Sequence, residues 1–165
     1  MSQYLTYIQL KPFIAQWLVH TFGDPVRFPH NSPENALLHR RCIQLPRGAQ
    51  PDVPGEGLTA IVIPWCDERN IRYYNYLPPD GKRELVYLIE CLFTLSWRQQ
   101  LLVELLDPNC KIKSVVLDWC TSHGIDEKYA NTIRQRIYRW RSSMHKNGFT
   151  TRKRRLRRSL FPKKH

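Results

Sequence analysis

The hydrophobic and polar positions along the chain predict a mainly helical fold. Residues 82–106 form the longest helical segment and are apolar on most sides, which indicates a central core helix or a dimer seam. Residues 3–22 carry apolar side chains at largely helical spacing, and Pro12 divides them into a short helix and a second helix. Another helix is expected from Ser32, an N-cap residue, to about Arg41.

Two segments, 58–65 and 71–77, are rich in β-branched and aromatic residues. We predict that residues 66–70 join them as a small β-hairpin, which must pack on the helices or pair with another strand such as 42–45. One face of the second strand would be covered by a helix or would stack on bases or ribose. The side chains of that face are Arg72, Tyr74 and Tyr76.

Residues 112–140 predict two helices joined at Gly124, a residue that tolerates the left-handed conformation of a tight turn. The first helix runs from about Lys113 to Ser122, and Asp126 is a plausible N-cap for the second. Apolar residues at steps of four or three along the second helix predict one core-facing stripe. The stripe consists of Ile125, Tyr129, Ile133, Ile137, Trp140 and Met144.

The opposite side of the second helix collects amide and cationic side chains. Amides can pair with adenine edges, and cations can meet phosphate or guanine. A generic polar surface is the simpler alternative, but no Asp or Glu follows Glu127, which favours nucleic acid. The candidate binding residues in this helix are Lys128, Asn131, Arg134, Gln135, Tyr138, Arg139 and Arg141.

This stretch resembles the helix-turn-helix DNA-binding family. The family's small residue, turn glycine, following apolar residue and Thr-apolar pair are matched by Cys120, Gly124, Ile125 and Thr132-Ile133. The pair arrives about three residues later than in the family, which one extra helical turn or a longer connection would absorb. The resemblance implies that the second helix enters the major groove. Its candidate base contacts would be Asn131, Gln135, Tyr138 and Arg139, with Lys128 at the entry.

Charge is segregated along the chain. Residues 1–110 carry 10 Lys and Arg against 11 Asp and Glu, whereas residues 111–165 carry 16 against 3. This footprint is typical of a phosphate-binding module, although the basic tail could also be a nuclear localisation signal. The tail's candidate phosphate contacts are Arg152, Lys153, Arg154, Arg155, Arg157 and Arg158.

The cysteine spacing and the scarcity of catalytic motifs limit the classes of protein that the chain could belong to. The five cysteines form no disulfide or zinc pattern, and no apolar run is long enough to cross a membrane. We therefore expect an intracellular setting, in the cytoplasm, nucleoid or nucleus, with most thiols buried. The acidic pair Asp67-Glu68 is the one candidate for metal-dependent nuclease chemistry, but a hairpin turn suits it better. The sequence predicts no enzyme, no metal and no cofactor.

The chain is expected to divide into residues 1–80, with N-terminal helices and the hairpin, residues 81–148, with the helical core and helix-turn-helix-like unit, and a basic flexible tail, 149–165. The predicted function is double-stranded DNA binding, as a transcriptional regulator or architectural factor. Alternatives are an RNA-binding or ribonucleoprotein component, or an assembly protein of a phage or mobile element. A homodimer through the 82–106 helix is a further hypothesis, and no membrane contact is expected.

Overall fold

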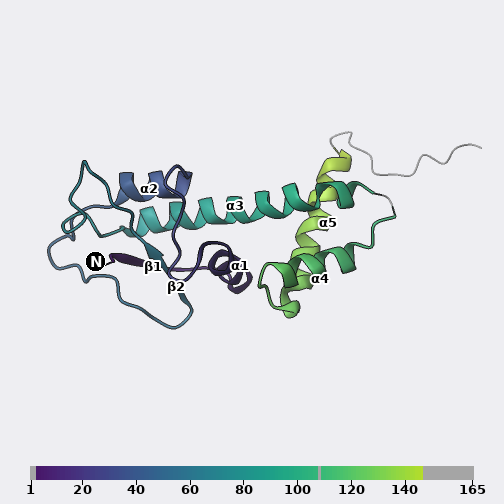
Figure 1. Cartoon of the computed structure of the whole chain (residues 1–165), viewed down its shortest axis with the longest axis horizontal. Helices are drawn as coiled ribbons and strands as arrows, with labels where there is room; N and C mark the ends of the chain where they lie inside the picture. Colours follow the sequence, from purple (N-terminus) through teal and green to yellow (C-terminus); the bar gives the residue numbers. More distant parts are fainter. Residues whose placement is uncertain (1–2, 108, 147–165) are drawn as a thin grey trace, which may run out of the picture.

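The computed structural model describes residues 3–107 and 109–146. Within these residues the chain is mainly helical with one small antiparallel sheet (Figure 1), which confirms the predicted fold class. The elements are β1 (Leu5–Gln9), α1 (Pro12–Phe22), α2 (Pro33–Arg41), β2 (Leu58–Val62), α3 (Pro79–Leu106), α4 (Ile112–Ser122), a 3₁₀ turn η1 (Glu127–Tyr129) and α5 (Ala130–Lys146).

The sheet pairs β1 with β2 in antiparallel register, from Leu5 opposite Val62 to Gln9 opposite Leu58. The prediction of a short helix before Pro12 is therefore wrong. Side chains along β1 alternate between partly exposed and buried, so that Ile8 is inside the core. This alternation has the period of a strand, and the β-prone residues of the segment reinforce it.

The predicted hairpin between residues 58–65 and 71–77 is also wrong, because β2 pairs with β1 instead. The backbone carbonyl of Asn70 accepts hydrogen bonds from the amides of Tyr73 and Tyr74, at 3.0 and 3.1 Å. These local bonds fold the tyrosine segment into turns. The predicted extra strand at 42–45 is reduced to one isolated antiparallel β-bridge, between Ile43 and Tyr76.

Local signals correctly predicted α2, whose N-cap Ser32 accepts a hydrogen bond from the Asn35 amide at 3.1 Å. The long helix α3 starts at Pro79, three residues before the predicted start at Lys82. Proline is favoured in the first turn of a helix because its missing N–H has no intrahelical partner there, and this explains the earlier start.

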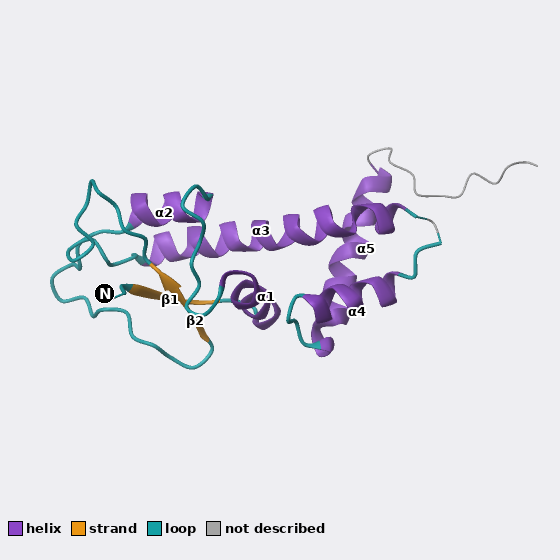
Figure 2. Ribbon diagram, in the orientation of Figure 1, coloured by secondary structure: helices purple, strands orange, loops and turns teal. Residues whose placement is uncertain are grey.

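Helix α3 is the axis around which the molecule is built (Figure 2). Its buried residues follow one another at steps of four, so the buried face rotates by about 40° per step around a helix of 3.6 residues per turn. The N-terminal part of α3 packs on α2, where Glu84 pairs with Arg40 and Arg41. Its C-terminal half packs on α4, where Gln100 accepts a hydrogen bond from Trp119. The buried residues of α3 are Gly81, Leu85, Ile89, Phe93, Trp97, Leu101 and Leu105.

All five cysteines are free thiols, as the spacing predicted. Cys42 and Cys120 are buried, and this burial raises the pKa of the Cys42 thiol to about 12 and that of Cys120 to about 11. Cys91 is exposed, and Cys66 and Cys110 are partly exposed. The expectation that most thiols are buried is therefore wrong, since it holds for two of the five.

Membrane-spanning helices and clusters of metal-binding side chains are both absent from the described residues. None of their helices combines the length and the apolar composition needed to cross a membrane. Nor do the described histidines, cysteines and acidic residues form any group of three or more that could hold a metal ion.

Candidate nucleic-acid interface

The turn between α4 and α5 is a Schellman motif centred on Gly124. Gly124 adopts φ 67°, a left-handed conformation that favours glycine. Its amide donates to the Thr121 carbonyl at 3.3 Å, and the Ile125 amide donates to the Cys120 carbonyl at 2.9 Å. Ile125 and Cys120 are both buried, which supplies the apolar contact that accompanies this motif. The predicted turn glycine is thereby confirmed.

The second helix does not begin directly after the turn. Residues Glu127–Tyr129 form one 3₁₀ turn, and α5 starts at Ala130. The Thr132-Ile133 pair therefore lies in the first turn of α5. Asp126 stands at the N-cap position of the 3₁₀ turn, but its side chain makes no capping hydrogen bond.

Asp126 is bound instead by Gln16 of α1. The Gln16 Nε2 donates to Asp126 Oδ2 at 3.0 Å, and the Asp126 amide donates to Gln16 Oε1 at 3.0 Å. Hydrogen bonds from Lys128 and Gln16 hold the pKa of the Asp126 carboxyl below its usual value. Sequence reasoning missed Gln16, because its partner lies 110 positions away and no local pattern marks the pair.

The apolar stripe of the second helix faces the core, as its spacing predicted. Ile133 and Ile137 are completely buried, and Tyr129 and Trp140 are partly buried against the same core. The Trp140 ring meets the Trp97 ring of α3 edge to face, with centroids 5.6 Å apart. These contacts fix which side of α5 is turned outward.

The outward side of α5 presents four of the predicted residues together. All four are exposed, and Tyr138 is 42% exposed. They are Asn131, Gln135, Tyr138 and Arg139. No acidic residue occurs in α5. Asn131, Gln135 and Tyr138 lie on one face because their positions differ by three, four and seven residues, and Arg139 adjoins them four residues after Gln135. We call this set the outer face of α5.

Asn131 on this face and Lys128 beside it already have partners within the protein. Arg134 Nη2 donates to Asn131 Oδ1 at 2.6 Å, which orders the Asn131 amide beside a cation. Lys128 forms an ion pair with Asp126 at 3.0 Å and lies over the Tyr129 ring, 5.1 Å from its centroid. Lys128 would have to exchange its carboxylate partner for a phosphate in order to contact nucleic acid.

The arginines on the two flanks of α5 pack against the rest of the protein. Arg141 is half-buried, and its charge partly opposes the rise in pKa that burial gives the Cys110 thiol. Arg136, on the other flank, lies over the Phe13 ring of α1 at 5.1 Å from the centroid. Among the candidate arginines of α5, Arg139 is therefore better exposed than Arg134 or Arg141.

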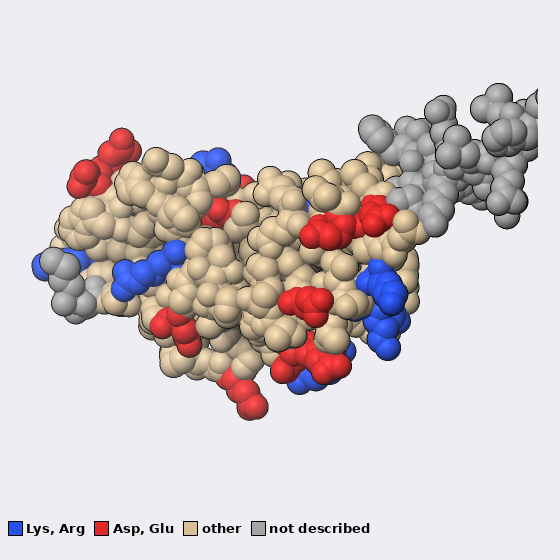
Figure 3. Space-filling view, turned by 45° about the vertical axis from the view of Figure 1, so that its right-hand side comes forward, with Lys and Arg blue, Asp and Glu red and all other residues tan. Residues whose placement is uncertain are grey.

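The surface around α5 is mixed in sign. Figure 3 shows acidic and basic side chains close together at the end of the molecule that carries α4 and α5. Asp118, Asp126 and Glu127 are exposed on α4 and the connection. They would repel phosphate, which restricts the approach of a nucleic acid to the acid-free side of α5. The predicted tail contacts, Arg152, Lys153, Arg154, Arg155, Arg157 and Arg158, lie outside the described residues.

Comparisons of the chain with models of known protein families, with curated proteins and with solved structures found no match.

Proposed function

We propose that the chain binds double-stranded DNA through the outer face of α5, as a transcriptional regulator or architectural factor. The observation that carries the proposal is the exposure of two amides, a tyrosine and an arginine on one acid-free helical face. Asn131 and Gln135 would read base edges in the major groove, Tyr138 would lie beside them, and Arg139 would contact phosphate. The basic tail would add sequence-independent affinity through counterion release.

The proposal predicts separate effects for amide and arginine variants of the full chain. A selection from a random duplex pool at ~200 mM salt, which suppresses backbone-only binding, would supply the preferred sequence. Gln135→Ala is expected to weaken binding to that duplex by about 5- to 150-fold, the equivalent of ~1–3 kcal/mol for one bidentate base contact. Arg139→Ala is expected to weaken binding to all duplexes equally. It should also reduce the salt slope, which is the slope of log affinity against log salt concentration, by about 1. Fluorescence anisotropy titrations measure both effects.

Arg83→Ala is the matched control, because Arg83 is exposed near the opposite end of α3 and its loss changes the charge equally. Wild-type affinity of both α5 variants for the selected duplex would refute the proposal. A preference for hairpin or single-stranded RNA would favour the ribonucleoprotein alternative. Binding that shows no sequence preference and is lost as the salt concentration rises would favour an assembly protein.

We also propose that α3 mediates a homodimer. Opposite its buried middle, α3 exposes an apolar strip that we call the outer stripe. Contiguous exposed apolar patches of this kind mark interaction surfaces, and a standard interface buries ~800 Å² per partner. Leu95, Leu102 and Leu106 follow one another at steps of seven and four, as in a coiled-coil seam. The outer stripe consists of Tyr87 (66% exposed), Cys91, Leu95 (50%), Leu102 (40%), Val103 (81%) and Leu106 (44%).

Size-exclusion chromatography with light scattering tests this dimer without nucleic acid. At micromolar concentration the expected mass is twice the 19.7 kDa of the chain, and Leu95→Glu with Leu102→Glu should reduce it to that of one chain. Val53→Glu is the control, since Val53 is 67% exposed but lies in the loop before β2. A wild-type protein that is strictly monomeric would exclude the interface.

A further inference from the structure

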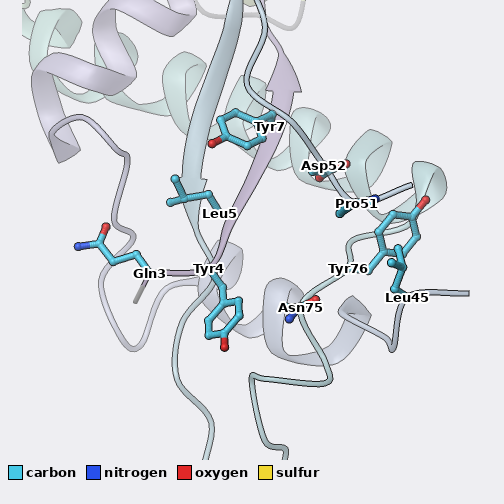
Figure 4. Close-up of a pocket in the computed structure, with 9 residues that line it drawn as sticks. All are labelled: Gln3, Tyr4, Leu5, Tyr7, Leu45, Pro51, Asp52, Asn75 and Tyr76. Carbon is cyan, nitrogen blue, oxygen red and sulfur yellow. The ribbon is translucent and has the colours of Figure 1, made fainter. Parts of the chain in front are cut away.

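Three adjoining hollows surround the start of β1 and the loop after β2. The first, of about 300 Å³, is drawn in Figure 4 and is lined in part by Gln3, Tyr4 and Tyr76. The second has about 750 Å³ and the third about 310 Å³. Gln3 and Tyr4 line both the first and the second, whereas Arg27 and Trp65 line both the second and the third. We call the three together the tryptophan groove.

Trp65 is the most unusual side chain of this groove. It is 65% exposed, whereas Trp17, Trp97 and Trp119 are at most 4% exposed. Its indole Nε1 donates to Asp67 Oδ1 at 3.1 Å, so the polar atom of the ring is satisfied within the loop. An exposed indole held in this way offers an apolar surface on which another flat ring can stack.

Positive charge lies beside this ring. Arg27 and Arg72 are exposed and line the 750 Å³ hollow together with Trp65. Within the described residues neither guanidinium belongs to an ion pair. The acid of the first hollow, Asp52, is neutralised by Lys82 at 2.6 Å and accepts a hydrogen bond from Thr6 at 2.6 Å.

Further aromatic side chains extend the groove on both sides of Trp65. Tyr4, Tyr7 and Tyr76 line the first hollow, where Figure 4 shows them around Asn75 and Asp52, and Phe28 lines the third. A ligand suited to this lining carries flat rings at intervals, joined by anionic linkers. Unpaired nucleotides have that chemistry, whereas the bases of a duplex are already stacked on one another.

We propose that the tryptophan groove binds single-stranded nucleic acid, with one base stacked on Trp65 and the adjoining phosphates at Arg27 and Arg72. The site goes beyond the proposed duplex contact, because it lies at the sheet-bearing end of the molecule and α5 lies at the other end (Figure 1). Base stacking gives the groove little sequence preference.

The test uses the full chain and a fluorescently labelled oligothymidylate of about 12 nucleotides, within the range of site sizes for single-strand binders. Trp65→Ala is expected to weaken binding by about 5- to 150-fold, which corresponds to ~1–3 kcal/mol of stacking on one base. Arg27→Ala and Arg72→Ala should each reduce the salt slope by about 0.7, the value for one phosphate of a single strand. Titrations at ~200 mM salt limit the contribution of the basic tail.

Tryptophan fluorescence gives a second readout that is local to the site. Because Trp65 is so much more exposed than Trp17, Trp97 and Trp119, it should account for a large part of the quenching by acrylamide. Saturating oligothymidylate is expected to reduce that quenching in the wild type and to have little effect in Trp65→Ala. Tyr73→Ala is the matched control, because Tyr73 is 63% exposed in the same loop but does not line the groove.

Unchanged affinity of Trp65→Ala, or unchanged quenching on binding, would overturn the proposal, as would an equal loss in Tyr73→Ala. An oligouridylate that binds with the same dependence on Trp65 would support it and extend the ligand to RNA. Failure of the duplex proposal is recognised separately, because that proposal is tested with Gln135→Ala and Arg139→Ala on duplex DNA.

Discussion

Replacing Phe93 with alanine is expected to lower the free energy of unfolding by about 3–5 kcal/mol, the usual cost of truncating a buried aromatic residue. The Phe93 side chain is completely buried. Its ring centroid lies 5.6 Å from that of Phe13, 5.4 Å from Trp17 and 5.8 Å from Trp119. The truncation would therefore leave a cavity where α1, α3 and α4 meet.

Urea denaturation followed by circular dichroism and by tryptophan fluorescence measures this loss. Both probes should report one transition that shifts to lower urea, because the buried ring joins α1 to α4. Tyr73→Ala, which removes an aromatic ring that is 63% exposed, should change the free energy of unfolding by no more than ~0.5 kcal/mol. A loss below ~1 kcal/mol for Phe93→Ala would contradict the packing described for this ring.

The second large effect is expected for Gly124→Val in the turn before α5. A β-branched residue such as valine held at this positive φ costs about 1–2 kcal/mol, and a Cβ here would lie 2.8 Å from Cδ2 and 3.1 Å from Cβ of His20. Overpacking against His20 adds a further cost, so the free energy of unfolding of Gly124→Val should be about 2–4 kcal/mol lower than that of the wild type. Thermal or urea unfolding measures the loss, and duplex affinity should fall with it if α5 is the binding element.

Two further variants separate the causes of this effect. Gly124→Asn retains a residue that tolerates the left-handed conformation but adds the same Cβ, so it isolates the contact with His20. His20→Ala should restore part of the stability of Gly124→Val, because it removes the imidazole but not the Cβ at 3.1 Å. If Gly124→Val were as stable as the wild type, the described turn geometry would be incorrect.

The sequence predicted those elements whose determinants are local. Helix α2 needs only the capping by Ser32 and the proline that follows it. The turn at Gly124 needs one residue that accepts a positive φ. The core stripe of α5 repeats within a single helix, so the outward position of Asn131 and Gln135 follows from the same wheel.

The largest errors concern pairing between distant segments. β1 and β2 are separated by about fifty residues, and a five-residue segment carries too few positions to distinguish a strand from one turn of helix. The segment 71–77 has a strong β propensity, yet hydrogen bonds to Asn70 fold it into turns. The contact of Gln16 with Asp126 and the grouping of Trp65 with Arg27 likewise exist only after folding.

The single uninterrupted helix α3 sets the distance between the two ends of the molecule. Its 28 residues correspond to about 42 Å at 1.5 Å per residue. A nucleic acid that met both the tryptophan groove and the outer face of α5 would have to pass from unpaired to paired structure within roughly that length. Forks, gapped molecules and strand ends next to a duplex have that form.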